Sequence, residues 1–202
     1  MADQEDASLD RRAFLRRGLT TAGGIATGAA LAGETAAAAM PGPVPTPSPG
    51  HALPYRLGVL AVEADLAGLD SVRGHLERMR RIAIKAAQGG LGPFEVSELD
   101  LEFYYQKSKI QLVAGGTAVA DLHLLDGTFT QLGLGLPPPN PHAVELELLD
   151  CTTSTLGLTT ISVITTANAA AAIADVDKAL HEVSSTLRET RAFARVYTQL
   201  GN

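Results

Sequence analysis

The chain has 202 residues, a formal net charge of −6 and a pI of about 5.3. This length fits one folded domain, and the acidic balance argues against a dedicated nucleic-acid binder, which normally carries an excess of Lys and Arg. The single cysteine, Cys151, excludes an internal disulfide and any zinc site built from several cysteines. The five histidines show no metal-ligand spacing, so neither a metal nor a cofactor is predicted.

The N-terminus is typical of an export signal. A weakly apolar run, 18–32, is followed by small residues at 36–39, in the order that a signal peptidase recognises. The run is too short and too rich in Gly and Ala for a stable membrane span. We predict a twin-arginine (Tat) signal peptide over residues 1–39 and delivery by the Tat machinery to the periplasm, the cell surface or the extracellular space. The alternative is a tail with a chance arginine pair. The motif RRxFL consists of Arg11, Arg12, Phe14 and Leu15.

Residues 40–54 follow as a proline-rich segment. Its prolines are Pro41, Pro43, Pro45, Pro47, Pro49 and Pro54. Regular prolines favour an extended, stiff chain. We predict a spacer that contributes no core, followed by a folded domain over residues 55–202.

Three stretches of the domain have helical periodicity, at about 58–88, 95–114 and 167–200. Their apolar residues recur at spacings of three, four and seven, which places each set on one stripe of a helix. The first stripe is Val62, Leu66, Leu69, Leu76, Met79, Ala83 and Ala86. The second is Val96, Leu99, Phe103, Ile110 and Val113. The third is Ile173, Val176, Leu180, Val183, Leu187, Thr190, Ala194 and Tyr197. Such stripes require partner helices at shallow crossing angles.

Between the second and third helices the period changes to two. Residues 122–124 and 144–148 alternate apolar and polar, as half-buried strands do, and 136–141 would join them. We therefore predict a small β-hairpin within residues 117–150. The predicted fold class is mainly α: an antiparallel, coiled-coil-like bundle of three helices, with this hairpin between helices two and three.

Basic residues gather on the first predicted helix, at Arg73, Arg78, Arg80, Arg81 and Lys85. They fall off the apolar stripe, and Glu77 lies one helical turn from both Arg73 and Arg81. A solvated, partly self-paired helix face explains the cluster without nucleic acid.

Motifs of catalysis are not found in the sequence. Gly133–Leu136 is expected in a loop and lacks the following helix of a dinucleotide site. Glu145 and Glu147 form a possible carboxylate pair, yet alternating Glu on a solvated strand face is the ordinary explanation. Tyr104 and Tyr105 suit either an exposed patch or the edge of the helix seam. We predict that the protein is not an enzyme.

Specific segments resemble the bacterial flagellin family. Leu76–Ala87, LERMRRIAIKAA, is similar to the flagellin motif LQRMRELAVQAA, and Leu122–Gly127 resembles the KLLDG segment that follows it. Thr155–Val183 resembles the flagellin C-terminal stretch TLGLSGLSVSTQANAQAAIAALDAALAQV. The likeness extends over about 59–127 and 151–202. It implies the inner helical domain of flagellin, with a signal peptide in place of the first terminal helix, no second terminal helix, and an outer region reduced to LGLGLPPPNPH.

Two functions follow from this resemblance as expectations. The first is a non-enzymatic, flagellin-like structural protein whose helices contact other copies or flagellin-type subunits, as in the bacterial flagellar filament. The second is a Tat-exported, monomeric periplasmic or surface binding module that reuses the domain without forming a filament.

The resemblance also implies a contact surface. In flagellins the matching helix face is used in subunit packing, and in animal hosts an innate immune receptor reads it. Arg78 stands at the position of the receptor-contacting arginine, and Glu102 matches a glutamate on the next helix. We predict that Arg78, Arg81 and Glu102 are exposed on one side of the bundle and form its protein-contact surface. The alternative is a solvated face that contacts nothing.

Overall fold

The computed structural model describes residues 52–138, 140 and 142–201. The predicted signal peptide and most of the proline-rich spacer lie outside these residues, including the motif residues Arg11, Arg12, Phe14 and Leu15. The description below concerns the helical domain.

The three predicted helices are present, as α2 (Tyr55–Ala87), α3 (Pro93–Gly116) and α4 (Thr166–Leu200). Helices α3 and α4 begin where the local chemistry favours a helix start. Pro93 occupies the first position of α3, and Glu95 Oε2 accepts the Gly92 N–H at 2.8 Å. Thr165 caps α4, because its hydroxyl oxygen accepts the Asn168 N–H at 3.0 Å.

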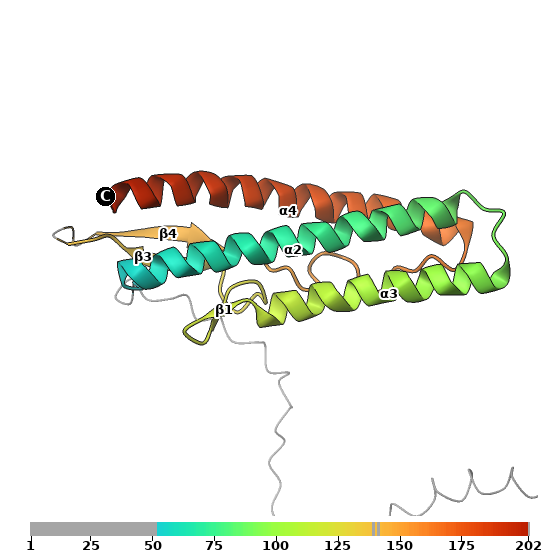
Figure 1. The fold of residues 1–202 in the computed structure, drawn as a ribbon, viewed down its shortest axis with the longest axis horizontal. Helices are drawn as coiled ribbons and strands as arrows, with labels where there is room; N and C mark the ends of the chain where they lie inside the picture. Colours follow the sequence, from blue (N-terminus) through green and yellow to red (C-terminus); the bar gives the residue numbers. More distant parts are fainter. Residues whose placement is uncertain (1–51, 139, 141, 202) are drawn as a thin grey trace, which may run out of the picture. The chain divides into compact units, whose positions relative to one another are not determined.

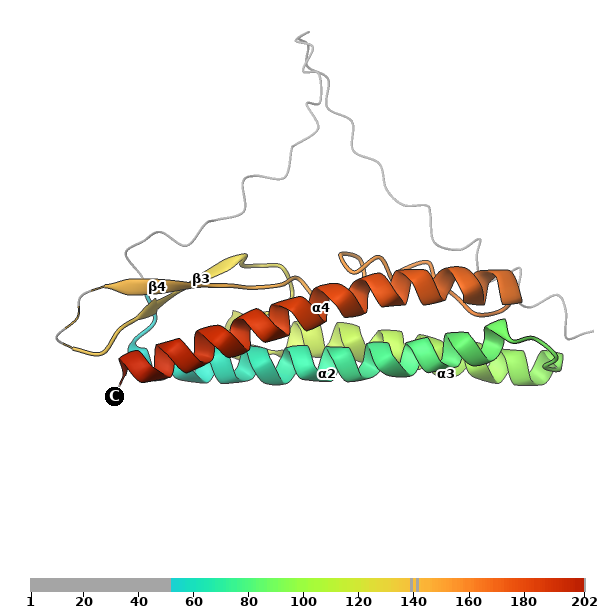
Figure 2. The same cartoon turned by 90° about the horizontal axis from the view of Figure 1, so that it is seen from above.

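Helix α2 is the central element of the bundle. It runs antiparallel to both α3 and α4 and packs along each of them (Figures 1 and 2). Its apolar residues are therefore buried on two sides of the helix. The prediction placed them on a single stripe. The largest fully buried side chains of the three helices are Leu69, Val72, Leu76 and Met79 in α2, Phe103 and Ile110 in α3, and Leu187 and Tyr197 in α4.

The segment 148–165, between the last strand and α4, completes the core. Its buried residues are Leu148, Cys151, Leu156, Leu158 and Val163. Polar side chains of α3 hold the segment in place. Asp100 Oδ1 accepts the Val163 N–H at 2.9 Å, and Lys107 Nζ donates to the Thr159 carbonyl at 3.0 Å. This segment, although rich in Thr and Ser, thus forms part of the packed interior.

The strands form two separate antiparallel pairs. β1 (Ala118–Val119) pairs with β2 (Leu122–His123), and β3 (Gln131–Gly135) pairs with β4 (Ala143–Glu147). The turn of the first pair has two residues at positive φ, Ala120 at 49° and Asp121 at 64°. Two-residue hairpin turns of type I′ require positive φ at both central positions.

The predicted hairpin paired the wrong two strands. Leu122 lies opposite Val119, and β4 pairs with β3 rather than with residues 122–124. Gly133–Leu136 was expected in a loop, but Gly133–Gly135 belong to β3. The two glycines lower the strand propensity of this segment, while the alternating Leu132 and Leu134 are buried and hold it in the sheet.

Leu53 joins the start of the domain to β3 by backbone hydrogen bonds. Its N–H donates to the Gly133 carbonyl at 2.9 Å, and its carbonyl accepts the Gly135 N–H at 2.8 Å. At the other end of the chain, the Tyr197 hydroxyl donates to the Gly135 carbonyl at 2.8 Å. Leu53 is partly buried against the core, so the expectation that the spacer contributes no core does not hold for this residue.

Candidate protein-contact surface

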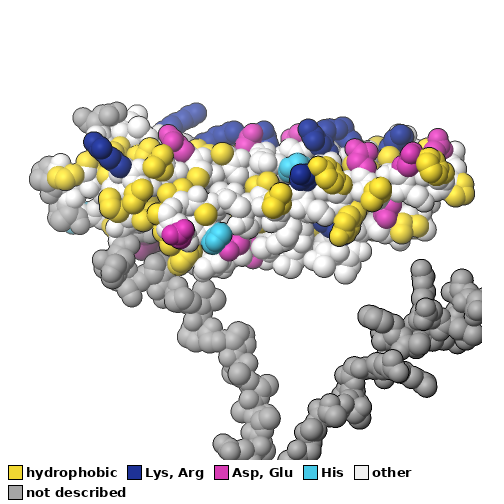
Figure 3. Space-filling model, turned by 60° about the horizontal axis from the view of Figure 1, so that its bottom comes forward, with side chains coloured by type: hydrophobic (Ala, Val, Ile, Leu, Met, Phe, Trp, Pro, Cys, Tyr) yellow, Lys and Arg dark blue, Asp and Glu magenta, His cyan; other side chains and the backbone are white. Residues whose placement is uncertain are grey.

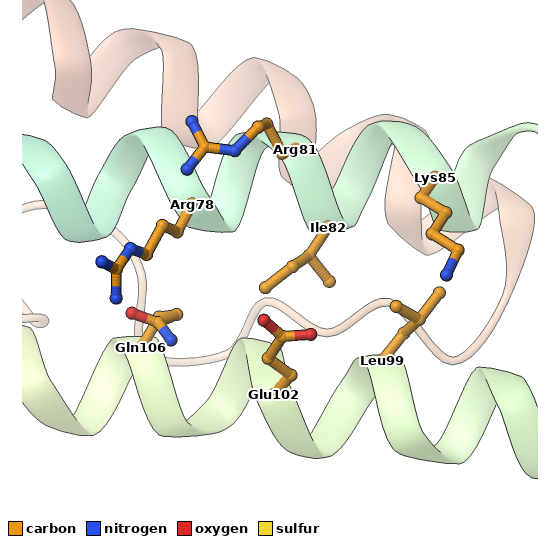
Figure 4. A pocket seen from close by; sticks show the side chains of 7 residues that line it. All are labelled: Arg78, Arg81, Ile82, Lys85, Leu99, Glu102 and Gln106. Atoms are coloured by element: carbon orange, nitrogen blue, oxygen red, sulfur yellow. The ribbon is translucent and has the colours of Figure 1, made fainter.

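Arg78, Arg81 and Glu102 lie together on one side of the bundle. They line a shallow depression between α2 and α3, and all three side chains are exposed (Figure 4). We call this depression the α2–α3 surface. Its lining residues are Arg78, Arg81, Ile82 and Lys85 from α2, and Leu99, Glu102 and Gln106 from α3.

Helical spacing builds this surface. Arg78, Arg81 and Lys85 follow one another at three and four residues, so they share one face of α2. Ile82 and Leu99 are 6% and 7% exposed and form the apolar floor between the helices. The charged side chains thus surround a small buried apolar contact.

A buried polar contact fixes one end of the α2–α3 surface. Gln106 is 4% exposed, and its Oε1 lies 2.8 Å from Nδ1 of His75. This hydrogen bond joins α3 to α2 and satisfies an amide oxygen that burial would otherwise destabilise. In the sequence, Gln106 is a polar residue that interrupts the apolar stripe of the second predicted helix.

The charges of the surface are left unpaired within the domain. Among the described residues, Arg78, Arg81, Lys85 and Glu102 make no ion pair within 4.0 Å, and the predicted contact from Glu77 to Arg81 is absent. Other basic residues of α2 do pair. Arg80 forms an ion pair with Asp177 of α4. Arg73 forms ion pairs with Asp70 at 2.8 Å and with Glu77 at 3.8 Å, and the contact with Glu77 is the one predicted from the sequence. The fold therefore pairs Arg73 and Arg80, whereas the charged residues of the α2–α3 surface have no ion pair within the described part of the chain.

The chemistry of the surface suits recognition. Its volume is about 360 Å³, at the lower end of pockets that hold small molecules. Three basic groups and one acidic group border it, and within the described ranges no group of His, Cys, Asp and Glu is arranged to hold a metal ion. Guanidinium groups bind carboxylates in paired hydrogen bonds, so Arg78 and Arg81 offer donors suited to carboxylate groups.

The other residues considered from the sequence are exposed. Glu145 and Glu147 lie on one face of β4, as an alternating strand requires. Tyr104 and Tyr105 are 60% and 54% exposed, which favours the exposed patch over the seam edge.

None of the helices in the described part of the chain has the length and apolar character needed to cross a bilayer.

Asp65 is a buried carboxylate that the sequence analysis missed. It has no exposed surface, and neither carboxylate oxygen makes a hydrogen bond to a described residue. Burial raises the pKa of Asp65 to about 7, and the nearby Thr190 hydroxyl of α4 opposes the shift. Its position signals this burial, because Ala61, Asp65 and Leu69 follow each other at four residues on the core side of α2.

Comparisons with known proteins give one informative likeness. No protein-family model matches the chain, and no curated protein matches its sequence. A flagellin from Bacillus cereus superposes with a TM-score of 0.65 at 21% identity, over 71% of this chain and 84% of that one. FliC from Burkholderia pseudomallei shows 26% identity with a TM-score of 0.44, over 48% and 38% of the two chains. The Bacillus comparison shows that the chain has a flagellin-like fold.

Proposed function

We propose that this chain is a non-enzymatic, flagellin-like structural protein that acts through contacts of its helical bundle with copies of itself or with flagellin-type subunits. The fold shared with the Bacillus cereus flagellin, over most of both chains, carries the proposal. The α2–α3 surface supports it, since exposed charges without internal partners are available to another protein.

Removing charge from the α2–α3 surface tests the proposal. We expect Arg78→Ala with Glu102→Ala to change the free energy of unfolding by less than about 0.5 kcal/mol, because both side chains are exposed. The same double variant should weaken self-association, or binding to flagellin subunits, in sedimentation. A matched control, Arg195→Ala with Glu189→Ala, removes the same charges from exposed positions of α4 and should leave association intact.

Two outcomes would contradict this reading. If the Arg78/Glu102 variant unfolds, these residues support the fold and are not a contact surface. If the wild-type protein stays monomeric and does not co-sediment with flagellins, the monomeric exported module becomes the better description.

We further propose export by the Tat machinery to the periplasm, the cell surface or a flagellum. The motif Arg11-Arg12-Ala13-Phe14-Leu15 supports this proposal. Replacing Arg11 and Arg12 with Lys should retain the precursor in the cytoplasm, as shown by cell fractionation. Arg16→Lys with Arg17→Lys is the matched control, and unchanged export in the first variant would exclude the Tat route.

An innate immune receptor of animal hosts is a further proposed partner. Arg78 and Glu102 stand at the matching positions and are exposed side by side at one depression. A flagellin-receptor reporter cell should respond to the wild-type domain and respond less to the Arg78/Glu102 variant. A reporter that ignores the wild-type protein would exclude this partner.

A further inference from the structure

Helix α3 carries a second apolar stripe that the domain does not bury. Phe94, Leu101, Tyr105 and Leu112 are 74%, 69%, 54% and 66% exposed. The core side of the same helix is formed by other residues, including Leu99, Phe103 and Ile110. Figure 3 looks onto the α3 side of the molecule and shows hydrophobic side chains at intervals along its surface. Exposed apolar residues that recur on one helix face indicate a contact site.

The spacing of this stripe is that of a coiled-coil seam. Its positions are Phe94, Glu98, Leu101, Tyr105, Ser108 and Leu112, separated by four, three, four, three and four residues. All six are exposed. An alternation of three and four keeps a seam facing one partner helix along its whole length. The last position lies eighteen residues after the first, which corresponds to about 27 Å of helix.

The stripe is symmetric about Phe103, and this symmetry identifies its partner. In an antiparallel pair of identical helices, Phe94 meets Leu112 of the second copy, Leu101 meets Tyr105, and Glu98 meets Ser108. Every apolar residue then contacts an apolar residue. A parallel pair would place Glu98 against Glu98 in the seam, where like charges repel and desolvation is costly.

The charges beside the seam favour the same arrangement. Glu95 and Lys109 occupy equivalent flanking positions near opposite ends of the stripe. Antiparallel pairing brings Glu95 of one copy beside Lys109 of the other, twice per dimer. Glu102 flanks the centre and meets its own counterpart there, and Arg78 at the same depression supplies the opposite charge in each copy.

We propose that two copies of this chain pair through the outer face of α3, antiparallel and centred on Phe103. This inference deepens the proposed function and rests on it, because it names a second copy as the partner next to the α2–α3 surface. A single helix pair buries less area than a standard stable interface, so the dimer should form reversibly with increasing concentration.

Cysteine cross-linking of the full chain tests the arrangement. A mixture of Phe94→Cys and Leu112→Cys proteins should form an intermolecular disulfide under mild oxidation, whereas each variant alone should not. Disulfides require Cα atoms within about 7 Å, and identical end positions lie about 27 Å apart in the antiparallel pair. Cys151 can stay in place because it is fully buried, and the wild-type chain, which should not cross-link, is the control.

A charged substitution gives an independent readout. Leu101→Asp should weaken dimerisation at least tenfold in sedimentation, while helical circular dichroism stays unchanged. Val196→Asp, at a similarly exposed position of α4 (56%), should leave dimerisation unchanged.

The contradicting outcomes are distinct. Cross-links within each single variant would mean parallel pairing, and a chain that stays monomeric at all accessible concentrations would mean no pairing; either result overturns the inference. Self-association that persists with a different cross-linking pattern also overturns it but leaves the proposed function standing. Loss of binding to flagellin subunits in the Arg78/Glu102 variant tests that function separately.

Discussion

Helices α2 and α3 are adjacent in the chain and in space, but they meet different surroundings. Twelve residues of α2 are buried, compared with five of α3. Among the large apolar side chains that are exposed in the described ranges, five of nine belong to α3. The fold therefore buries a larger share of α2 than of α3, and the outer apolar residues of α3 keep most of their surface in water.

Truncating one leucine on each of the two helices should give the largest difference between them in unfolding free energy. Leu76→Ala in α2 removes a fully buried side chain and should cost about 2–5 kcal/mol of unfolding free energy. Leu112→Ala in α3 removes a side chain that is 66% exposed and should change it by less than about 0.5 kcal/mol. Urea unfolding at low protein concentration measures both, and similar costs would show that the outer face of α3 supports the fold.

The pH dependence of stability sharpens the description of α2. The folded-state pKa of Asp65, about 7, lies above the ordinary value of 3.8, so folding favours the protonated carboxyl. The resulting destabilisation is absent below about pH 4, grows as the pH rises, and reaches its full value above about pH 7. A shift of this size corresponds to roughly 4 kcal/mol when the carboxyl is fully ionised.

Replacing the carboxyl should remove this dependence. The gain in stability of Asp65→Asn over the wild type should increase between pH 5 and pH 8, as followed by thermal unfolding. Glu63→Gln changes an exposed carboxyl on the same helix and provides the control. A gain that does not vary with pH would mean that Asp65 does not titrate in this range.

Two glycines of α2 give the smallest expected effect. A Cβ at Gly68 would lie 2.5 Å from Leu125 Cδ1 and 2.8 Å from Thr117 Oγ1, so Gly68→Ala should cost about 1–3 kcal/mol. Gly74 has open space around it, and Gly74→Ala should stabilise the helix by about 0.5–1 kcal/mol. Thermal unfolding of the two variants should therefore shift in opposite directions. Destabilisation by both would mean that α2 is packed on all sides.

The periodic parts of the fold could be predicted from the sequence. Apolar spacing of three and four placed all three helices, because a long helix repeats its buried face many times. The sheet could not be placed in the same way. Gln131–Gly135 has two glycines and only two buried leucines, and its bridge to Leu53 depends on a contact distant in sequence. Short strands carry too few repeats for a pattern to identify their partners.

The candidate site shows the same division. Exposure of Arg78 and Arg81 follows from their positions off the apolar stripe of α2, and the exposure of Glu102 follows from its place beside buried Phe103. The shared depression also depends on how α2 and α3 align, which the resemblance to flagellins implied but the spacing did not. Residue type alone is a poor guide to Asp65. A carboxylate is normally expected at the surface, but the position of Asp65 among the apolar residues of one helix stripe indicates burial.

The central position of α2 has a consequence for folding during synthesis. Only five residues, 88–92, separate α2 from α3, so these two helices can form a local hairpin soon after they leave the ribosome. Helix α4 is made last, and its partner side on α2 stays in water until then. The nascent chain therefore exposes one apolar side of α2 to water until the 35-residue helix α4 docks.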